Sequence, residues 1–173
     1  TNNEELYEKI KILRYVGQRV KFIHEVIGFQ DRLDELQAAM LSVKLKRLDE
    51  WNNRRRKIAA IYDEMLKDTP LQLPYVEDYC HHVYYSYAAL APSEEERNNL
   101  LIYLNQHEIG AFAMYPILVP MQRAYEYLGH QESDFPIGAS NARRVINLPM
   151  FETLREDEAR EVAEAVLVYY DRA

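Results

Sequence analysis

The chain has 173 residues, of which 48% are hydrophobic and 28% charged, and its formal net charge is -7. This composition indicates a folded, soluble protein of one domain, or one domain plus an arm, rather than a disordered chain, and the negative charge argues against a nucleic-acid partner. No stretch approaches the roughly 20 apolar residues of a membrane span, the polar start does not resemble a signal peptide, and a single cysteine excludes an internal disulfide. We therefore expect a cytoplasmic protein that binds neither nucleic acid nor membrane.

The first 30 residues predict a short amphipathic helix followed by a loop. Asn3 is a good N-cap, and hydrophobic residues then recur at helical spacing as far as Gly17. Residues 18–30 show no sustained period and contain Gly28, which is typical of a loop.

The longest predicted element is a helix from about residue 32 to residue 67, because no proline or glycine occurs between Gly28 and Pro70. At 1.5 Å per residue it would be about 50 Å long, so we expect it to link two bodies. The polar stretch 52–57 divides its apolar stripe and predicts a kink or a change of buried face near Trp51. The basic residues in this stretch are interpreted as a solvated helix face or a local anion contact.

The remaining residues predict a small α+β layer, in which a short sheet has helices packed on one face. Aromatic and β-branched residues indicate strands at 82–90 and 109–115, and a short third strand at 146–148. Ser93 and Glu96 have the spacing of a capping box. Helices are predicted over 93–106, 121–128, 137–145 and 156–170.

Generic searches for a catalytic or metal site find little. The five glycines form no phosphate-binding loop, and the run Tyr79-Cys80-His81-His82 lacks a second ligand pair at zinc spacing. Cys80 is interpreted as a structural cysteine rather than as a nucleophile. From the residues alone, the chain is a soluble α+β domain without a complete active site.

An ordered set of motifs along the chain gives a more specific hypothesis. Residues 28–39, Gly-Phe-Gln-Asp-Arg-Leu-Asp-Glu-Leu-Gln-Ala-Ala, resemble the Gly-x-Asn-x-Arg signature of the DegT/DnrJ family of pyridoxal-phosphate (PLP) sugar aminotransferases. Thr-Asn-Asn-Glu-Glu-Leu at 1–6 resembles the segment that follows the cofactor lysine in this family. Val-Lys-Leu-x-x-Leu-Asp-x-Trp-Asn at 43–52 and Asn-Leu-Pro-Met-Phe at 147–151 resemble later segments, in the same order.

The resemblance implies the α+β (α/β) carboxyl-terminal small domain of an aspartate-aminotransferase-like enzyme of fold type I. It divides the chain into a remnant of the cofactor domain at 1–30, a long interdomain helix at 31–69 and the small domain at 70–173. The implied parent enzyme is a homodimer, formed through the Gly28–Ala39 turn and the long helix. It transfers an amino group from glutamate to a keto nucleotide-linked deoxysugar in amino-sugar or surface polysaccharide biosynthesis, with a 3-keto sugar favoured over a 4-keto sugar.

The resemblance also implies site residues. In the family a lysine holds PLP covalently, and none of the seven lysines here has its setting, so the chain alone is expected to be inactive and to bind no PLP covalently. Gln30 stands where the family has an Asn that reaches the cofactor phosphate across the dimer, and Gln keeps the amide donor. Arg32 supports the phosphate or anchors the turn. Tyr115 and Gln122 are the implied substrate contacts.

Two departures from the family pattern lie in the segment His-Tyr-Pro-x-Pro-x-His-x-Gln. Met114 and Pro120 replace its two histidines, which predicts a more apolar pocket if those histidines hold substrate. The plainer interpretation of Met114 and Met121 is core packing. An alternative function is a catalytically silent dimerisation or binding module from a truncated or degenerate family member.

Overall fold

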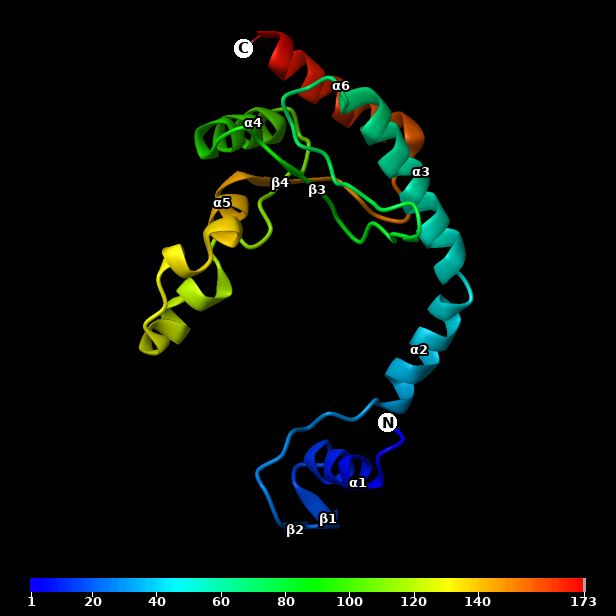
Figure 1. Ribbon diagram of the computed structural model, residues 1–173. Coiled ribbons are helices and arrows are strands. Elements are labelled where there is room, and N and C mark those ends of the chain that lie inside the picture. The colour runs from blue at the N-terminus through cyan, green and yellow to red at the C-terminus, as the bar shows by residue number, and fades with distance from the viewer. Residues whose placement is uncertain (173) are drawn as a thin grey trace. The chain divides into compact units, whose positions relative to one another are not determined.

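The computed structural model describes residues 1–172, without the side chain of Arg172, and divides into two compact units, Thr1–Leu48 and Asp49–Ala173 (Figure 1). The division into three parts at residues 30 and 69 stays a prediction. Among the described residues, no helix combines the length and the hydropathy that a bilayer crossing requires.

The first unit contains two helices and one hairpin. Helix α1 (Glu4–Leu13) begins after Asn3, whose Oδ1 accepts from the Leu6 amide at 2.9 Å, so the predicted cap is confirmed. Strands β1 (Gln18–Val20) and β2 (Ile23–His24) pair antiparallel within the predicted loop, and helix α2 (Glu35–Leu45) follows.

The expected single long helix is interrupted. Helix α3 (Leu48–Leu66) begins after a turn at Lys46 and Arg47, a few residues before the predicted kink at Trp51. The Arg47 amide bonds the Lys44 carbonyl at 2.9 Å, a three-residue spacing that ends the α-helical pattern. Helix α2 has no buried residue, so no tertiary packing stabilises it as a continuation of α3. The predicted helix is therefore two helices, and the break between them lies before the position predicted for the kink.

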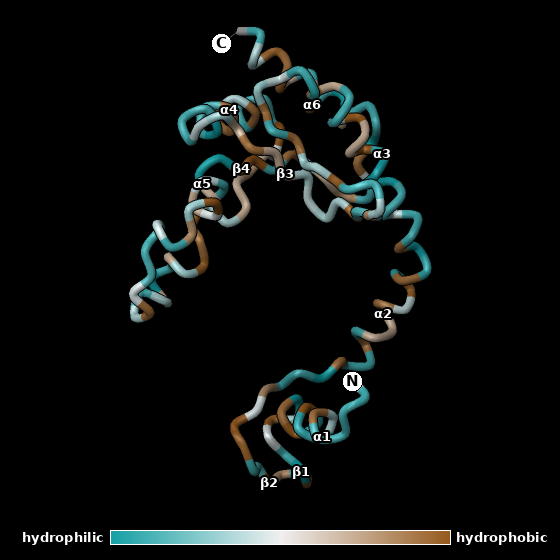
Figure 2. Tube along the Cα trace, in the orientation of Figure 1, coloured by the Kyte–Doolittle hydropathy of each residue, from teal (hydrophilic) through white to brown (hydrophobic). Residues whose placement is uncertain are grey.

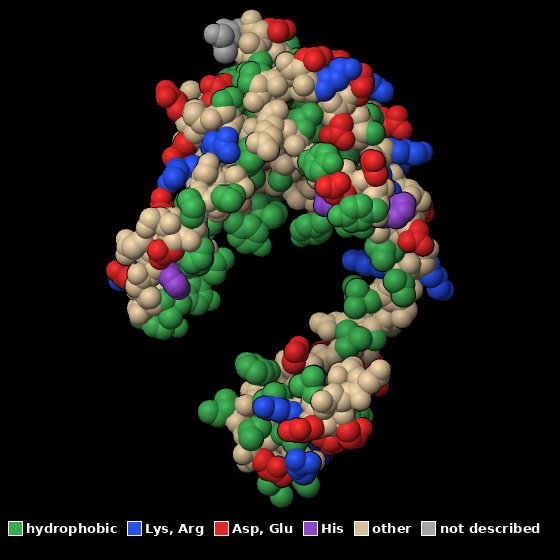
Figure 3. Space-filling view, viewed as in Figure 1, with side chains coloured by type: hydrophobic (Ala, Val, Ile, Leu, Met, Phe, Trp, Pro, Cys, Tyr) green, Lys and Arg blue, Asp and Glu red, His purple; other side chains and the backbone are tan. Residues whose placement is uncertain are grey.

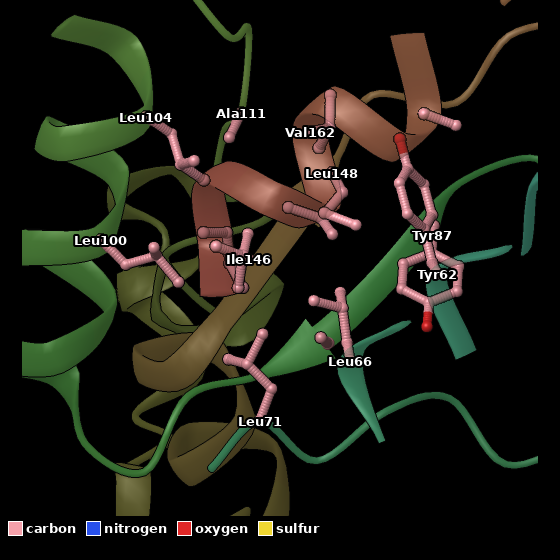
Figure 4. Close-up of a cluster of buried hydrophobic side chains, with 14 of the residues drawn as sticks. Tyr62, Leu66, Leu71, Tyr87, Leu100, Leu104, Ala111, Ile146, Leu148 and Val162 are labelled. Carbon is pink, nitrogen blue, oxygen red and sulfur yellow. The ribbon is translucent and has the colours of Figure 1, made fainter. Parts of the chain in front are cut away.

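The second unit has a two-stranded antiparallel sheet beside three helices. Strand β3 (Tyr87–Leu90) pairs with β4 (Val145–Leu148), so that Tyr87 lies opposite Leu148. Helices α3, α4 (Glu94–Gln106) and α6 (Glu156–Arg172) supply buried side chains to the core beside this sheet (Figure 4). The α+β class and the short antiparallel sheet are therefore confirmed.

Two predicted elements of the second unit are smaller than expected. The strand at 109–115 is reduced to a single bridge between Phe112 and Asn147, because prolines follow and no further ladder forms. The helix at 121–128 is a 3-10 helix over Arg123–Leu128, with further 3-10 turns at Val119–Met121 and Glu132–Asp134. Helix α5 (Pro136–Arg144) leads directly into β4.

Helix α4 begins at the predicted cap. Ser93 Oγ accepts from the Glu96 amide at 3.1 Å, which confirms the Ser93 half of the capping box. The Glu96 carboxylate instead lies near Tyr169, whose pKa is raised first by burial and then by this negative charge. The acidic first turn of α4 therefore also contacts the carboxyl-terminal helix.

Two tyrosines form the centre of the core near α3. The rings of Tyr62 and Tyr87 lie 4.9 Å apart, and both side chains are fully buried (Figure 4). The Tyr62 hydroxyl donates to the Pro149 carbonyl at 2.8 Å, and the Tyr87 hydroxyl donates to Asp63 at 2.7 Å. Burial raises the pKa of both phenols, so both remain protonated donors at neutral pH.

Candidate functional site

The first unit joins two segments of backbone around Gly28. The Phe29 amide donates to the Leu13 carbonyl at 2.7 Å, and the Val16 amide donates to the Phe29 carbonyl at 2.9 Å. A Cβ atom at Gly28 would lie 2.2 Å from the Gly17 nitrogen and 2.7 Å from the Leu13 oxygen. Glycine is therefore required here by the close approach of two backbones.

The following residues lie beside the end of α1. Gln30 forms an antiparallel bridge with Tyr15, and the Asp31 amide donates to the Arg14 carbonyl at 3.0 Å. The Arg32 guanidinium lies 5.0 Å from the centre of the Tyr15 ring. This cation–π contact holds Arg32 on the turn and leaves its N–H donors free to bind a ligand.

A cavity of about 350 Å³ opens at this contact. Within the described residues, Arg14 and Arg32 at its wall form no ion pair, so their charge is available to an anion. A phosphate group fits such a surface because guanidinium groups bind phosphate oxygens through paired N–H donors. The lining residues are Glu8, Lys11, Ile12, Arg14, Tyr15, Gln18, Arg19 and Arg32.

The other charges of the cavity wall are already paired. Lys11 contacts Glu8 at 2.8 Å, and Arg19 contacts Glu25 at 3.1 Å. The exposed side chain of Gln30 is not part of the wall, so its contact with a phosphate stays a prediction.

The predicted substrate residues lie in the second unit. Tyr115 is exposed and has a positive φ of 57°. The Gln122 amide nitrogen donates to the Ile117 carbonyl at 3.4 Å, a long bond that closes the loop between them. Gln30 and Arg32 belong to the first unit, so the structure places the two predicted pairs in separate units.

A second cavity, of about 300 Å³, lies beside the segment that carries Tyr115. Its wall combines aromatic and thioether side chains with the polar side chains of Arg55, Ser86 and Glu152, and its role as a more apolar substrate pocket stays a prediction. Met114 forms part of this wall, and neither Met114 nor Met121 belongs to the buried core, so the core-packing interpretation was wrong. The lining residues are Arg55, Tyr85, Ser86, Phe112, Met114, Leu148, Met150, Phe151 and Glu152.

The basic run on α3 binds neighbouring loops of its own unit. Arg54 Nε donates to the Leu154 carbonyl at 3.2 Å, and Arg55 forms an ion pair with Glu152 at 3.1 Å. Arg56 donates to the His82 carbonyl at 3.4 Å. The run agrees with both parts of the interpretation, because Arg55 makes a local anion contact with Glu152, and Arg54 and Lys57 are exposed.

Cys80 and its histidine neighbours form no ligand set. Cys80 is exposed and therefore lies outside the core, and its interpretation as a structural cysteine rather than a nucleophile stays a prediction. Over residues 1–172, no three His, Cys, Asp or Glu side chains gather where they would hold a metal ion.

Some residues of these sites were not identified from the sequence. Arg14 and Lys11 join Arg32 at the first cavity, and their three-residue spacing on one helix face was the available signal. Asn147 holds the backbone next to Tyr115, and a polar residue within an apolar strand was the signal for it.

The chain resembles known proteins over nearly its whole length. Residues 1–167 match the DegT/DnrJ/EryC1/StrS aminotransferase family. The chain is 36% identical over 173 residues to a pleiotropic regulatory protein of Geobacillus stearothermophilus, covering 98% of this chain and 46% of that protein. It is 38% identical over 169 residues to dTDP-3-amino-3,6-dideoxy-alpha-D-galactopyranose transaminase of Aneurinibacillus thermoaerophilus, covering 98% of this chain and 45% of that enzyme.

A solved structure has the same fold. The crystal structure of S. venezuelae DesV in complex with a ketimine intermediate superposes with a TM-score of 0.89 and 34% sequence identity. The match covers 100% of this chain and 46% of that chain. The chain therefore spans less than half the length of each of these three relatives.

Proposed function

Because the chain belongs to the DegT/DnrJ/EryC1/StrS aminotransferase family, we propose that it forms the carboxyl-terminal part of a PLP-dependent sugar aminotransferase. The proposed reaction transfers an amino group from glutamate to a keto nucleotide-linked deoxysugar in the cytoplasm. A 3-keto sugar is favoured, which the name of the A. thermoaerophilus relative supports because it is a 3-amino sugar transaminase. The observation that carries the proposal is the family match over residues 1–167.

The cavity beside Arg32 supports a role in binding the cofactor phosphate. Arg14 and Arg32 present positive charge there. Gln30 lies nearby, because its backbone forms a bridge with Tyr15, which lines the cavity. When bound, PLP supplies the electron sink for transamination. The proposed role of these residues is to bind and orient its phosphate, whereas Tyr115 and Gln122 bind the sugar substrate.

The lysines support the proposal that the covalent attachment lies outside these residues. A lysine nucleophile requires a lowered pKa. The hydrogen bond that Lys11 donates to the Glu8 carboxylate raises the pKa of Lys11, and the bond that Lys67 donates to Glu64 raises the pKa of Lys67. Both amines are therefore held in the protonated form at neutral pH.

We expect no single lysine of the 173-residue chain to be labelled stoichiometrically when the chain is mixed with PLP and reduced with borohydride. Peptide mapping by mass spectrometry measures the labelling. Weak labelling spread over several lysines is the expected result. One fully labelled lysine would show that the chain carries its own cofactor attachment site.

The gene tests the enzyme proposal directly. We expect the reading frame ahead of the Thr1 codon to encode a Ser-x-x-Lys motif, and the complete gene product to aminate a dTDP-linked 3-keto deoxysugar with glutamate. The Arg32→Ala variant of that product should bind PLP more weakly, because it loses a charged phosphate donor. A stop codon directly before Thr1, or an unrelated frame, favours the catalytically silent dimerisation or binding module instead.

The exposed face of α2 supports the proposed homodimer. Hydrophobic side chains are exposed along this helix. Figure 2 marks hydrophobic residues of α2 in brown on the Cα trace, and Figure 3 shows hydrophobic side chains there in green at the surface. Leu36 is 75% exposed, and Met40 is 57% exposed one turn later. Such a face is typical of a surface that is covered by a partner.

We expect the chain to self-associate, and the double variant Leu36→Lys, Met40→Lys to weaken association by at least about tenfold, because each buried apolar side chain contributes about 1.5–3 kcal/mol. Sedimentation equilibrium measures this change. The matched control is Ile137→Lys, which alters an equally exposed side chain on α5. Wild-type protein that remains monomeric at every concentration tested would contradict the dimer.

A further inference from the structure

Tyr115 occupies a backbone conformation that a residue with a side chain rarely adopts. Its φ of 57° lies in the left-handed region, and its side chain is 71% exposed. The exposed ring buries little surface that would offset the conformational free energy of this geometry. The conformation must therefore be maintained by the residues on either side of Tyr115.

The residue before Tyr115 is held by a buried side chain. Asn147 lies on β4 and is 1% exposed. Its Oδ1 accepts from the Met114 amide at 2.9 Å. Its backbone also pairs with Phe112 in both directions, at 2.7 and 3.2 Å. Asn147 therefore fixes the strand bridge at Phe112 and the amide of Met114, directly before Tyr115.

A second bond fixes the orientation of the Asn147 amide. A backbone N–H can only donate, so the side-chain oxygen faces Met114 and the NH₂ group faces away from it. That NH₂ group donates to Ser86 Oγ at 2.7 Å, one residue before β3. The amide is thus held from both ends, and an apolar side chain of similar size would satisfy neither partner.

We propose that Asn147 is the positioning residue that holds Tyr115 in its left-handed conformation, and that Ser86 fixes Asn147 for this role. This inference rests on the proposed function, in which Tyr115 contacts the sugar substrate. Asn147 itself is buried and touches no ligand. Asn147 acts on catalysis only indirectly. It holds the Met114 amide, and this bond sets the backbone conformation of the next residue, Tyr115.

Amide hydrogen exchange of the 173-residue chain tests the structural half. In the wild type, the Met114 amide should exchange far more slowly than the neighbouring loop amide of Ile117. The Asn147→Leu variant should lose about tenfold or more of this protection, the equivalent of one buried hydrogen bond. Asn147→Asp should retain it, because a carboxylate oxygen accepts from Met114 while the Ser86 hydroxyl turns to donate to the other oxygen.

Two measurements keep this test decisive if Asn147→Leu does not fold. The first is the comparison of the Met114 and Ile117 amides within the wild-type chain, which requires no variant. Equal exchange rates at these two amides would overturn the proposal. Ser86→Ala retains the Met114 bond and removes only the partner that orients the amide. Its expected effect is a smaller loss of protection at Met114, with protection in α4 and α6 unchanged.

Steady-state kinetics of the complete gene product test the functional half. Asn147→Leu should raise the KM for the keto-sugar by about tenfold or more, while the KM for glutamate and the PLP content remain at the wild-type value. Asn147→Asp should have a KM for the keto-sugar close to that of the wild type. Equal losses for both substrates would indicate a merely structural role and overturn the proposal. If the wild type has no aminotransferase activity, the proposed function fails, whereas the exchange experiment still decides whether Asn147 holds the Met114 amide directly before Tyr115.

Discussion

Tyr62→Ala is expected to lower the free energy of unfolding of the second unit by about 3–5 kcal/mol, the range for truncating a large buried aromatic side chain. Tyr62 is 0% exposed, and its ring lies 4.9 Å from that of Tyr87. The substitution leaves a cavity beside Tyr87 and removes the donor to the Pro149 carbonyl. The loss thus combines lost burial with an unsatisfied acceptor.

Urea denaturation followed by circular dichroism measures this loss, with two controls. Tyr62→Phe keeps the ring and removes only the hydroxyl, so about 1 kcal/mol should be lost. Tyr75→Ala alters a side chain that is 82% exposed and should change the free energy of unfolding by less than about 0.5 kcal/mol. Equal values for Tyr62→Ala and Tyr75→Ala would contradict the described core.

Gly28→Ala is expected to abolish the pairing between the two backbone segments of the first unit. The new Cβ atom would meet the Gly17 nitrogen, the Leu13 oxygen and the Val16 carbonyl carbon, all within 3 Å and all on backbone that cannot rotate away. Overpacking of this kind costs at least about 1–3 kcal/mol. Few side chains of this unit are buried, so little other packing opposes the loss.

Hydrogen exchange of the Phe29 and Val16 amides measures this loss, because both amides donate across the two segments. Both should exchange at the rate of an unstructured chain in Gly28→Ala. Gly110→Ala is the matched control, since a Cβ atom at Gly110 would meet nothing within 4 Å. Protected amides in Gly28→Ala would show that the two segments are not packed as described.

The features predicted most accurately from the sequence are those that depend only on neighbouring residues, such as helix caps. Asn3 and Ser93 cap their helices as expected, because an N-cap depends on residues within one turn. The motif that begins at Gly28 also indicated the family correctly, and the structure gives a physical reason for its first residue. Sequence periodicity could not show that α2 lacks a packing partner, so the interruption at Arg47 was missed.

The site was predictable only in part. Arg32 and Tyr115 came from the resemblance, and spacing alone would not have selected them. The charged cavity depends on pairing between the end of α1 and a segment about 15 residues later, which is a tertiary contact. Asn147 accepts from the Met114 amide across 33 residues, and the polar residue within an apolar strand does not by itself indicate this partner.

The core of the second unit also has a consequence for synthesis of the chain. The buried face of α3 ends at Leu66, but its partners Ile146 and Leu148 lie 80 residues or more further along the chain. At about 5–20 residues per second, a ribosome needs roughly 4–16 s to make those 80 residues. During this interval Ile58, Tyr62 and Leu66 lack the part of their native core that β4 and α6 supply. We therefore expect chaperones that recognise exposed hydrophobic segments to bind the nascent helix until β4 has emerged.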